Sequence, residues 1–147
     1  MWQNLNVFGA RCLGAGVLFA YPQATNALRL ALENELSSTP KSEIADCRVQ
    51  AACTWVFHAS KPLLWWAKEN IGYTDVPAND TANHFKQGPL YDGSATMCFE
   101  RWHFWIGRFE NLAKERSGLS NHTRQLAAGA AHTMKAAEGH LASILSA

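Results

Sequence analysis

Four basic side chains interrupt apolar stretches of this sequence and are the residues best placed to do chemistry. Arg11 and His58 stand in apolar runs of the first half of the chain, and Arg101 and His103 flank a tryptophan in the second. A hydrogen-bond donor held in an apolar pocket can polarise the carbonyl group of a ligand. We therefore predict four candidate catalytic residues, with salt-bridged or carbonyl-bound structural roles as the alternative: His58, His103, Arg101 and Arg11.

Aromatic side chains accompany these donors in unusual number. The 147 residues include six tryptophans and seven phenylalanines, whereas charged residues make up only 17%. Such a composition is typical of a protein with an apolar cavity or an apolar partner surface. We expect one set of aromatic residues to form the wall of a substrate pocket, with core packing as the alternative: Trp55, Trp65, Trp66, Tyr91, Trp102 and Trp105.

The usual catalytic and cofactor signatures are missing. Six histidines form neither HxxxH nor HExxH, and no carboxylate or cysteine completes a metal site at a recognisable spacing. The sequence has no GxSxG nucleophile motif and no glycine-rich phosphate loop. We therefore predict no metal and no cofactor. The formal net charge of +1, without a basic cluster, excludes nucleic acid as an expected partner.

Cysteine usage and hydropathy bear on location. The four cysteines contain no CxxC pair and lie in apolar helical patterns, where a free cysteine behaves as a small hydrophobe. We expect reduced, buried thiols and a cytoplasmic location. No apolar run approaches the roughly 20 residues of a membrane-spanning helix, so we expect no membrane span.

Helices must position all of these residues, because no stretch alternates long enough to form a β-strand. We predict one all-α domain over residues 1–147, an irregular bundle of five or six helices with one long loop at about residues 73–95. The expected helices cover residues 1–14, 23–36, 41–61 with a continuation from Pro62 to about 72, 96–116 and 120–145.

The apolar stripes predict which helix faces are buried. In the first helix the inner face should hold Trp2, Leu5, Phe8 and Cys12, and in the second Glu33 and Glu35 should face water. The aromatic helix should bury Phe99, Trp102, Ile106, Phe109 and Leu112. Only a short turn separates it from the last helix, so these two should pack antiparallel, with the small residues 127–131 facing the aromatic helix.

Four blocks of the sequence resemble a helical family of fungi rich in secondary metabolism, a family known only as a domain of unknown function. These blocks are Trp-x-x-Leu-Asn-x-Phe-x-Ala-Arg from Trp2, Ala-Leu-Arg-x-Ala-Leu-Glu from Ala27, Gly-Pro-Leu-Tyr-x-Gly from Gly88 and Glu-Arg-Trp-x-Phe-Trp-x-x-Arg-Phe from Glu100. The resemblance supplies no catalytic residues. Family members carry further helical sequence before the first block, which favours a homodimer.

Small fungal proteins of unknown family beside biosynthetic genes sometimes prove to be cyclases that need no cofactor. The resemblance therefore implies a cofactor-independent cyclase or pericyclase, of intramolecular Diels–Alder type, acting on a hydrophobic terpenoid intermediate. A cycloaddition needs neither nucleophile nor metal, because a shaped apolar pocket supplies the required proximity. Two alternatives stay open: a non-catalytic helical module that dimerises or binds a protein, and a carrier of an apolar metabolite.

Overall fold

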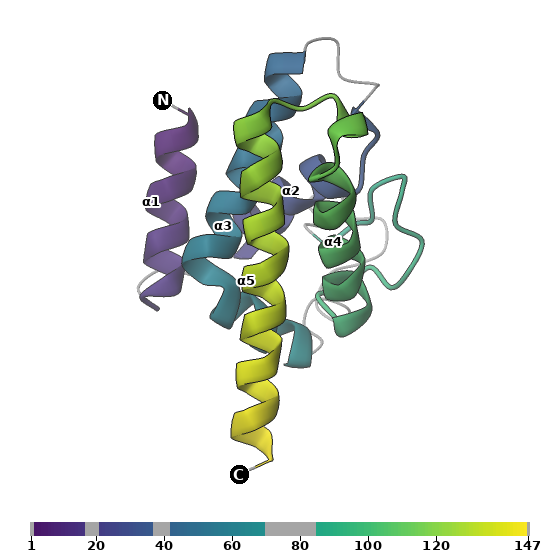
Figure 1. Ribbon diagram of the computed structural model, residues 1–147. Coiled ribbons are helices and arrows are strands. Elements are labelled where there is room, and N and C mark those ends of the chain that lie inside the picture. The colour runs from purple at the N-terminus through teal and green to yellow at the C-terminus, as the bar shows by residue number, and fades with distance from the viewer. Residues whose placement is uncertain (1, 17–20, 37–41, 70–84, 147) are drawn as a thin grey trace.

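A computed structural model of the chain describes residues 2–16, 21–36, 42–69 and 85–146 (Figure 1). It contains five α-helices, α1 (Trp2–Gly14), α2 (Tyr21–Leu32), α3 (Ser42–Glu69), α4 (Phe99–Leu112) and α5 (Asn121–Leu145), and a short 3₁₀ helix, η2 (Glu115–Ser117). No β-strand occurs within these ranges. The predicted all-α fold class is confirmed. Residues 73–84 of the predicted long loop lie outside the described residues.

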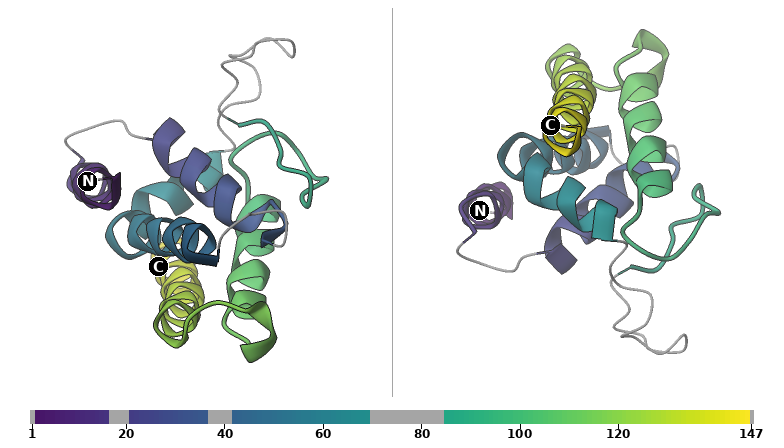
Figure 2. Two further views of the ribbon diagram at one scale, coloured as in Figure 1. Left: turned by 90° about the horizontal axis from the view of Figure 1, so that it is seen from above. Right: turned by 90° about the horizontal axis from the view of Figure 1, so that it is seen from below.

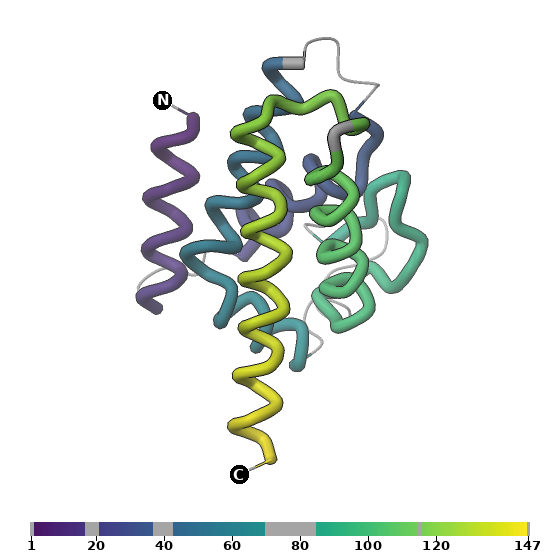
Figure 3. Tube along the Cα trace, in the orientation of Figure 1, coloured from purple at the N-terminus to yellow at the C-terminus, as the bar shows by residue number. Residues whose placement is uncertain are grey.

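The helices are arranged around α3, which packs against each of the other four. Viewed along the bundle, α1 lies at one edge and α4 at the other side (Figure 2). Helices α4 and α5 lie side by side and antiparallel, as predicted, and the C-terminal end of α5 runs past the rest of the bundle (Figures 1 and 3).

The turn between α4 and α5 follows the predicted pattern of glycine and serine. Gly118 adopts a positive φ of 77°, and Ser120 caps α5 by accepting a hydrogen bond of 3.2 Å from the Thr123 backbone N–H. The carboxylate of Asp46 on α3 accepts hydrogen bonds from the backbone N–H and the hydroxyl of Ser120, at 3.0 and 3.1 Å. The start of α5 is thereby fixed to α3.

Helix α3 is long because Pro62 bends it instead of ending it. The bend appears as a non-helical residue, Ala59, with φ −135° and ψ 22°. Proline has no N–H, so the carbonyl of His58, four residues earlier, lacks its helical donor. That carbonyl faces α1, where a Cβ at Gly14 would overlap its oxygen. Only glycine fits at Gly14 without a shift of α1 away from the bend.

Helix α1 packs with the opposite face to the one we predicted. Three of the four residues expected inside, Trp2, Leu5 and Phe8, are between 47% and 65% exposed, and the fourth, Cys12, is only partly buried. The buried face holds Gly9, Ala10 and Leu13. The reason is the indole of Trp55 on α3, whose ring would lie 2.9 Å from a Cβ at Gly9, so that only small residues allow close approach. The bulky face of α1 is left without a cover among the described residues.

The core is one cluster of buried residues to which all five helices contribute. Trp102 and Phe109 of α4 are completely buried, as the aromatic stripe predicts, and so is Trp105, which we expected in a pocket wall; Phe99 is partly exposed and departs from the prediction. The four cysteines are free thiols, but Cys47 is exposed and only Cys53 is fully buried. None of the described helices combines the length and apolar character that crossing a bilayer demands.

Candidate functional site

The predicted aromatic wall does not gather around one cavity. Three different hollows among the described residues each receive one of the six side chains. Trp55 lines a cleft between α1 and α2, Trp65 lines a groove between α3 and α5, and Tyr91 borders an open hollow beside residues 86–92. The cleft between α1 and α2 has the size and lining expected of a small-molecule site.

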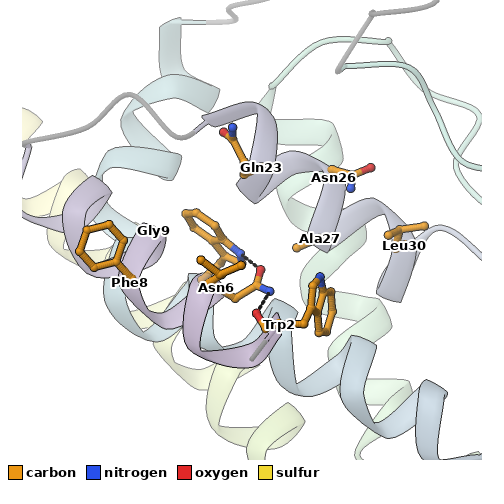
Figure 4. A pocket seen from close by; sticks show the side chains of 10 residues that line it. Trp2, Asn6, Phe8, Gly9, Gln23, Asn26, Ala27 and Leu30 are labelled. Atoms are coloured by element: carbon orange, nitrogen blue, oxygen red, sulfur yellow. Dashed lines mark hydrogen bonds between the residues drawn. The ribbon is translucent and has the colours of Figure 1, made fainter.

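This α1–α2 cleft has a volume of about 370 Å³, within the range of roughly 300–1,000 Å³ that is typical of ligand pockets. Its lining is mostly apolar, with three amide side chains and no charged group (Figure 4). The lining residues are Trp2, Leu5, Asn6, Phe8, Gly9, Gln23, Asn26, Ala27, Leu30 and Trp55.

Hydrogen bonds hold the aromatic part of the cleft in place. The indole N–H of Trp55 donates to Oδ1 of Asn6 at 2.7 Å, and Nδ2 of Asn6 donates to the backbone carbonyl of Trp2 at 2.9 Å (Figure 4). Trp55 is almost completely buried, so this bond satisfies an indole N–H that would otherwise be costly to leave unpaired. The result is a rigid aromatic surface at the base of the cleft.

The two amides contributed by α2 are the polar groups available to a ligand. Asn26 accepts a 2.6 Å hydrogen bond from Arg29 through Oδ1, which leaves the Nδ2 hydrogens as donors. Gln23 is exposed and makes no hydrogen bond with a described residue. The cleft can therefore hold a hydrocarbon against its walls and donate to a carbonyl oxygen at its rim.

Arg101 lies elsewhere, at the centre of a buried polar cluster. Both Arg101 and Glu33 are completely buried, and Nε and Nη2 of the guanidinium lie 2.6 and 3.0 Å from the two carboxylate oxygens. Glu33 also accepts hydrogen bonds from the indole N–H of Trp105 at 2.8 Å and the backbone N–H of Gly88 at 2.7 Å. The prediction that Glu33 faces water is wrong, because four donors converge on its carboxylate.

The other N–H groups of Arg101 are also occupied. They donate to the backbone carbonyls of Phe85 at 2.6 Å, Lys86 at 3.0 Å and Thr96 at 3.4 Å. The guanidinium carbon lies 5.2 Å from the centre of the Tyr91 ring. Arg101 thus joins the end of α2, residues 85–96 and α4, and in this arrangement it has no N–H left for a ligand.

None of the other three predicted donors lines the α1–α2 cleft. Arg11 and His58 are exposed, on α1 and at the bend of α3. His103 is exposed on α4, where its Nε2 lies 2.6 Å from Oε1 of Glu138 on α5. His103 therefore joins α4 to α5 at the surface of the protein.

The remaining aromatic candidates pack against other protein groups. Trp66 stacks on Tyr21 with ring centres 3.5 Å apart, and Trp102 and Trp105 are core residues. Tyr91 is nearly buried against Phe104. Burial raises the pKa of the Tyr91 hydroxyl, with a further contribution from its hydrogen bond to the Cys98 thiol, so the phenol stays neutral.

Trp55 is the predicted wall residue that lines the α1–α2 cleft, and the sequence analysis did not name the amides that line it too. Asn6, Gln23 and Asn26 are ordinary polar residues within amphipathic helices, and only the placement of α1 beside α2 brings them to one hollow. The sequence feature that could have indicated this cleft is the apolar stripe of α1, which the structure leaves exposed. In the part of the chain that the structure describes, no three His, Cys, Asp or Glu side chains lie together as a metal site would require.

Comparison with known proteins gives a family but no activity. No match was found among curated proteins or among solved structures. A family model described as "Protein of unknown function (DUF3632)" matches residues 1–109. The match covers about three quarters of the chain and includes both the α1–α2 cleft and the Glu33–Arg101 cluster, whereas α5 lies beyond it. The chain belongs to the DUF3632 family of proteins of unknown function.

Proposed function

We propose that the α1–α2 cleft binds a hydrophobic, carbonyl-bearing small molecule and promotes its intramolecular cyclisation without a cofactor. The observation that carries this proposal is the cleft itself: about 370 Å³, aromatic at its base and edged by neutral amides only. Holding the two reacting parts of one molecule in contact fixes its reactive conformation in advance and so lowers the barrier to cyclisation.

The cleft supports a division of roles. The indole of Trp55 and the apolar side chain of Leu30 would hold a folded hydrocarbon, while the amide N–H groups of Asn26 and Gln23 would donate to its carbonyl oxygen. Such donation draws electrons from a conjugated alkene and favours its reaction with a diene. The role that the sequence suggested for four basic residues passes in this proposal to the amides of α2.

The finer form of the proposal is a Diels–Alder reaction of a terpenoid in fungal secondary metabolism, of the norbornene-forming kind that sordarin-type diterpenes require. The resemblance of the sequence blocks supports the fungal setting, and the uncharged lining supports a pericyclic step over acid–base chemistry. We also propose a cytoplasmic location, which the four free cysteines support.

Leu5→Glu and Leu145→Glu form a matched pair that tests the site. The two leucines are similarly exposed, at 64% and 58%, but only Leu5 lines the cleft. The purified variants would be incubated with terpenoids that carry a diene and a tethered unsaturated carbonyl, and product formation and stereochemistry followed by chromatography. We expect acceleration over buffer in the wild type and in Leu145→Glu, and its loss in Leu5→Glu, because a charge enters the apolar wall.

Asn26→Leu refines the same test. We expect this variant to keep binding the substrate but to accelerate the reaction less, because it removes the donor while keeping a side chain with the same branching. If the wild-type protein changes neither the rate nor the stereochemistry of any candidate, cyclisation is refuted. Binding that is lost in Leu5→Glu without turnover in the wild type would identify a carrier.

A second candidate function rests on the uncovered face of α1. Trp2, Leu5 and Phe8 are exposed together on one side of this helix, as in a module that dimerises or binds a protein partner. Light scattering over a range of concentrations separates the two candidates. A dimer that Leu5→Glu dissociates favours the interaction module, and a monomer at every concentration excludes the homodimer.

A further inference from the structure

A second apolar groove lies at the other end of the molecule, between the last turns of α3 and α5. Its volume is about 160 Å³, and its walls include Leu64 and Trp65 of α3 and Leu141 and Ile144 of α5. Leu64 is buried, but Trp65 and Ile144 are about half exposed. The groove therefore exposes apolar surface to solvent, and no other helix among the described residues covers it.

The bend in α3 explains why this surface stays open. After Ala59 the last third of α3 changes direction, and α5 continues beyond the end of the bundle (Figure 1). On each helix the groove residues follow one stripe, at positions 61, 64 and 65 of α3 and 137, 140, 141 and 144 of α5.

The polar residues of the groove are both basic in type. They are Lys61 and His140, and neither forms a hydrogen bond or ion pair with a described residue. No carboxylate lines the groove. Another basic residue, Lys68, lies 4.5 Å from the centre of the Trp65 ring and forms an ion pair with Glu69 at 3.1 Å. An apolar chain that ends in an anion would complement this arrangement.

The dimensions restrict the occupant further. The stripe from residue 137 to 144 spans seven residues, or about 10 Å of helix. The volume is about half the lower limit of pockets that enclose a drug-sized ligand, roughly 300 Å³. The groove admits one narrow chain of moderate length and excludes a ring system of terpenoid size.

We infer that the α3–α5 groove binds a free medium-chain aliphatic carboxylate. The alkyl chain would lie against Trp65, Leu141 and Ile144, and the carboxylate would take hydrogen bonds from Lys61 and His140. This site is separate from the α1–α2 cleft and shares no lining residue with it. Carboxylate binding in this groove can therefore be tested independently of the proposed cyclisation.

Calorimetric titration of the full chain with decanoate, below its micellar concentration, tests the inference. Decanol serves as the uncharged probe of equal chain length. We expect decanoate to bind about tenfold more tightly than decanol, because only the acid can pair with the two basic groups. In Lys61→Gln/His140→Gln this preference should disappear, while His132→Gln/Lys114→Gln, altered at exposed positions outside the groove, should retain it.

A second variant keeps the test decisive. Ile144→Asp should abolish decanoate binding, because it places a carboxylate beside the alkyl chain, and its exposed position leaves the fold intact. The inference is overturned by equal affinity for decanoate and decanol, by no binding of decanoate, or by equal loss in the control variant. Binding to anionic phospholipid vesicles without binding of free decanoate would also overturn it and would indicate a membrane-docking surface.

Discussion

Replacing Arg101 by methionine should cost the protein a large part of its stability. Methionine has a similar length and no charge, so Arg101→Met leaves the Glu33 carboxylate buried with only two of its four donors, Trp105 and Gly88. Removing one partner of a buried ion pair typically costs about 3–5 kcal/mol. Since a domain is stable by only about 5–15 kcal/mol, the variant should approach the limit of folding at room temperature.

A double-mutant cycle gives this prediction its sharpest form. Glu33→Leu alone leaves the buried Arg101 charge without its carboxylate and should cost a similar amount of stability. Glu33→Leu/Arg101→Met removes both charges together. The double variant still leaves the buried N–H groups of Gly88 and Trp105 without their acceptor, at roughly 1–3 kcal/mol each, whereas the Lys86 carbonyl keeps its hydrogen bond from Arg29. We expect the double variant to lose at least about 2 kcal/mol less stability than the two single variants lose when their losses are added.

Urea denaturation followed by far-ultraviolet circular dichroism and tryptophan fluorescence measures these free energies. Arg11→Met is the control, because Arg11 is exposed on α1, and it should change the free energy of unfolding by no more than about 0.5 kcal/mol. If Arg101→Met costs less than about 1 kcal/mol, the structural role assigned to this pair is refuted. Loss of catalytic activity with unchanged stability would return Arg101 to the catalytic role suggested by the sequence.

Four further outcomes follow from local features of the structure. Gly14→Ala should cost about 1–3 kcal/mol in urea denaturation, because its Cβ overlaps a carbonyl of α3, whereas Gly107→Ala, with open space around it, should stabilise α4 by up to about 1 kcal/mol. Burial raises the pKa of the Cys53 thiol to about 12, so a thiol reagent should modify exposed Cys47 in the native protein and reach Cys53 only after unfolding; equal rates would contradict this. Burial opposes ionisation of Asp46, but hydrogen bonds from Thr123 and Ser120 outweigh it and lower its pKa. This contribution to stability is present above the unfolded pKa of about 3.9 and is lost as the pH falls through the folded value, so Asp46→Asn should flatten the acid limb of a pH–stability curve.

Local sequence rules were sufficient for the helices and for one pair of them. Periodicity gave the bounds of α1 and α5 to about one residue and those of α4 to within four, and the short turn around Gly118 and Ser120 predicted the antiparallel packing. These features depend on neighbours in sequence, so the pattern contains the information. The fold class followed for the same reason.

Contacts between distant residues were not predictable in this way. Helical periodicity placed Glu33 toward water, but α2 ends at Leu32, and beyond the helix end the period no longer sets a direction. In α1 the pattern correctly identified an apolar face, which we expected to be buried. It could not show that the opposite face, with its small residues, would pack against Trp55 instead. A basic residue in an apolar run indicated burial for Arg101, yet not which carboxylate it meets.

The Glu33 cluster also has a consequence for the order in which the chain folds. Its donors come from positions 55, 68 and 72 residues further along the sequence, whereas α4 and α5 meet across a short turn. Closing long loops is entropically costly, and the carboxylate gains from losing its water only when the donors have arrived together. We expect the cluster to form after the transition state, so that Glu33→Gln accelerates unfolding in stopped-flow experiments and leaves the folding rate nearly unchanged. The lifetime of the native state would then depend on one carboxylate at the end of α2.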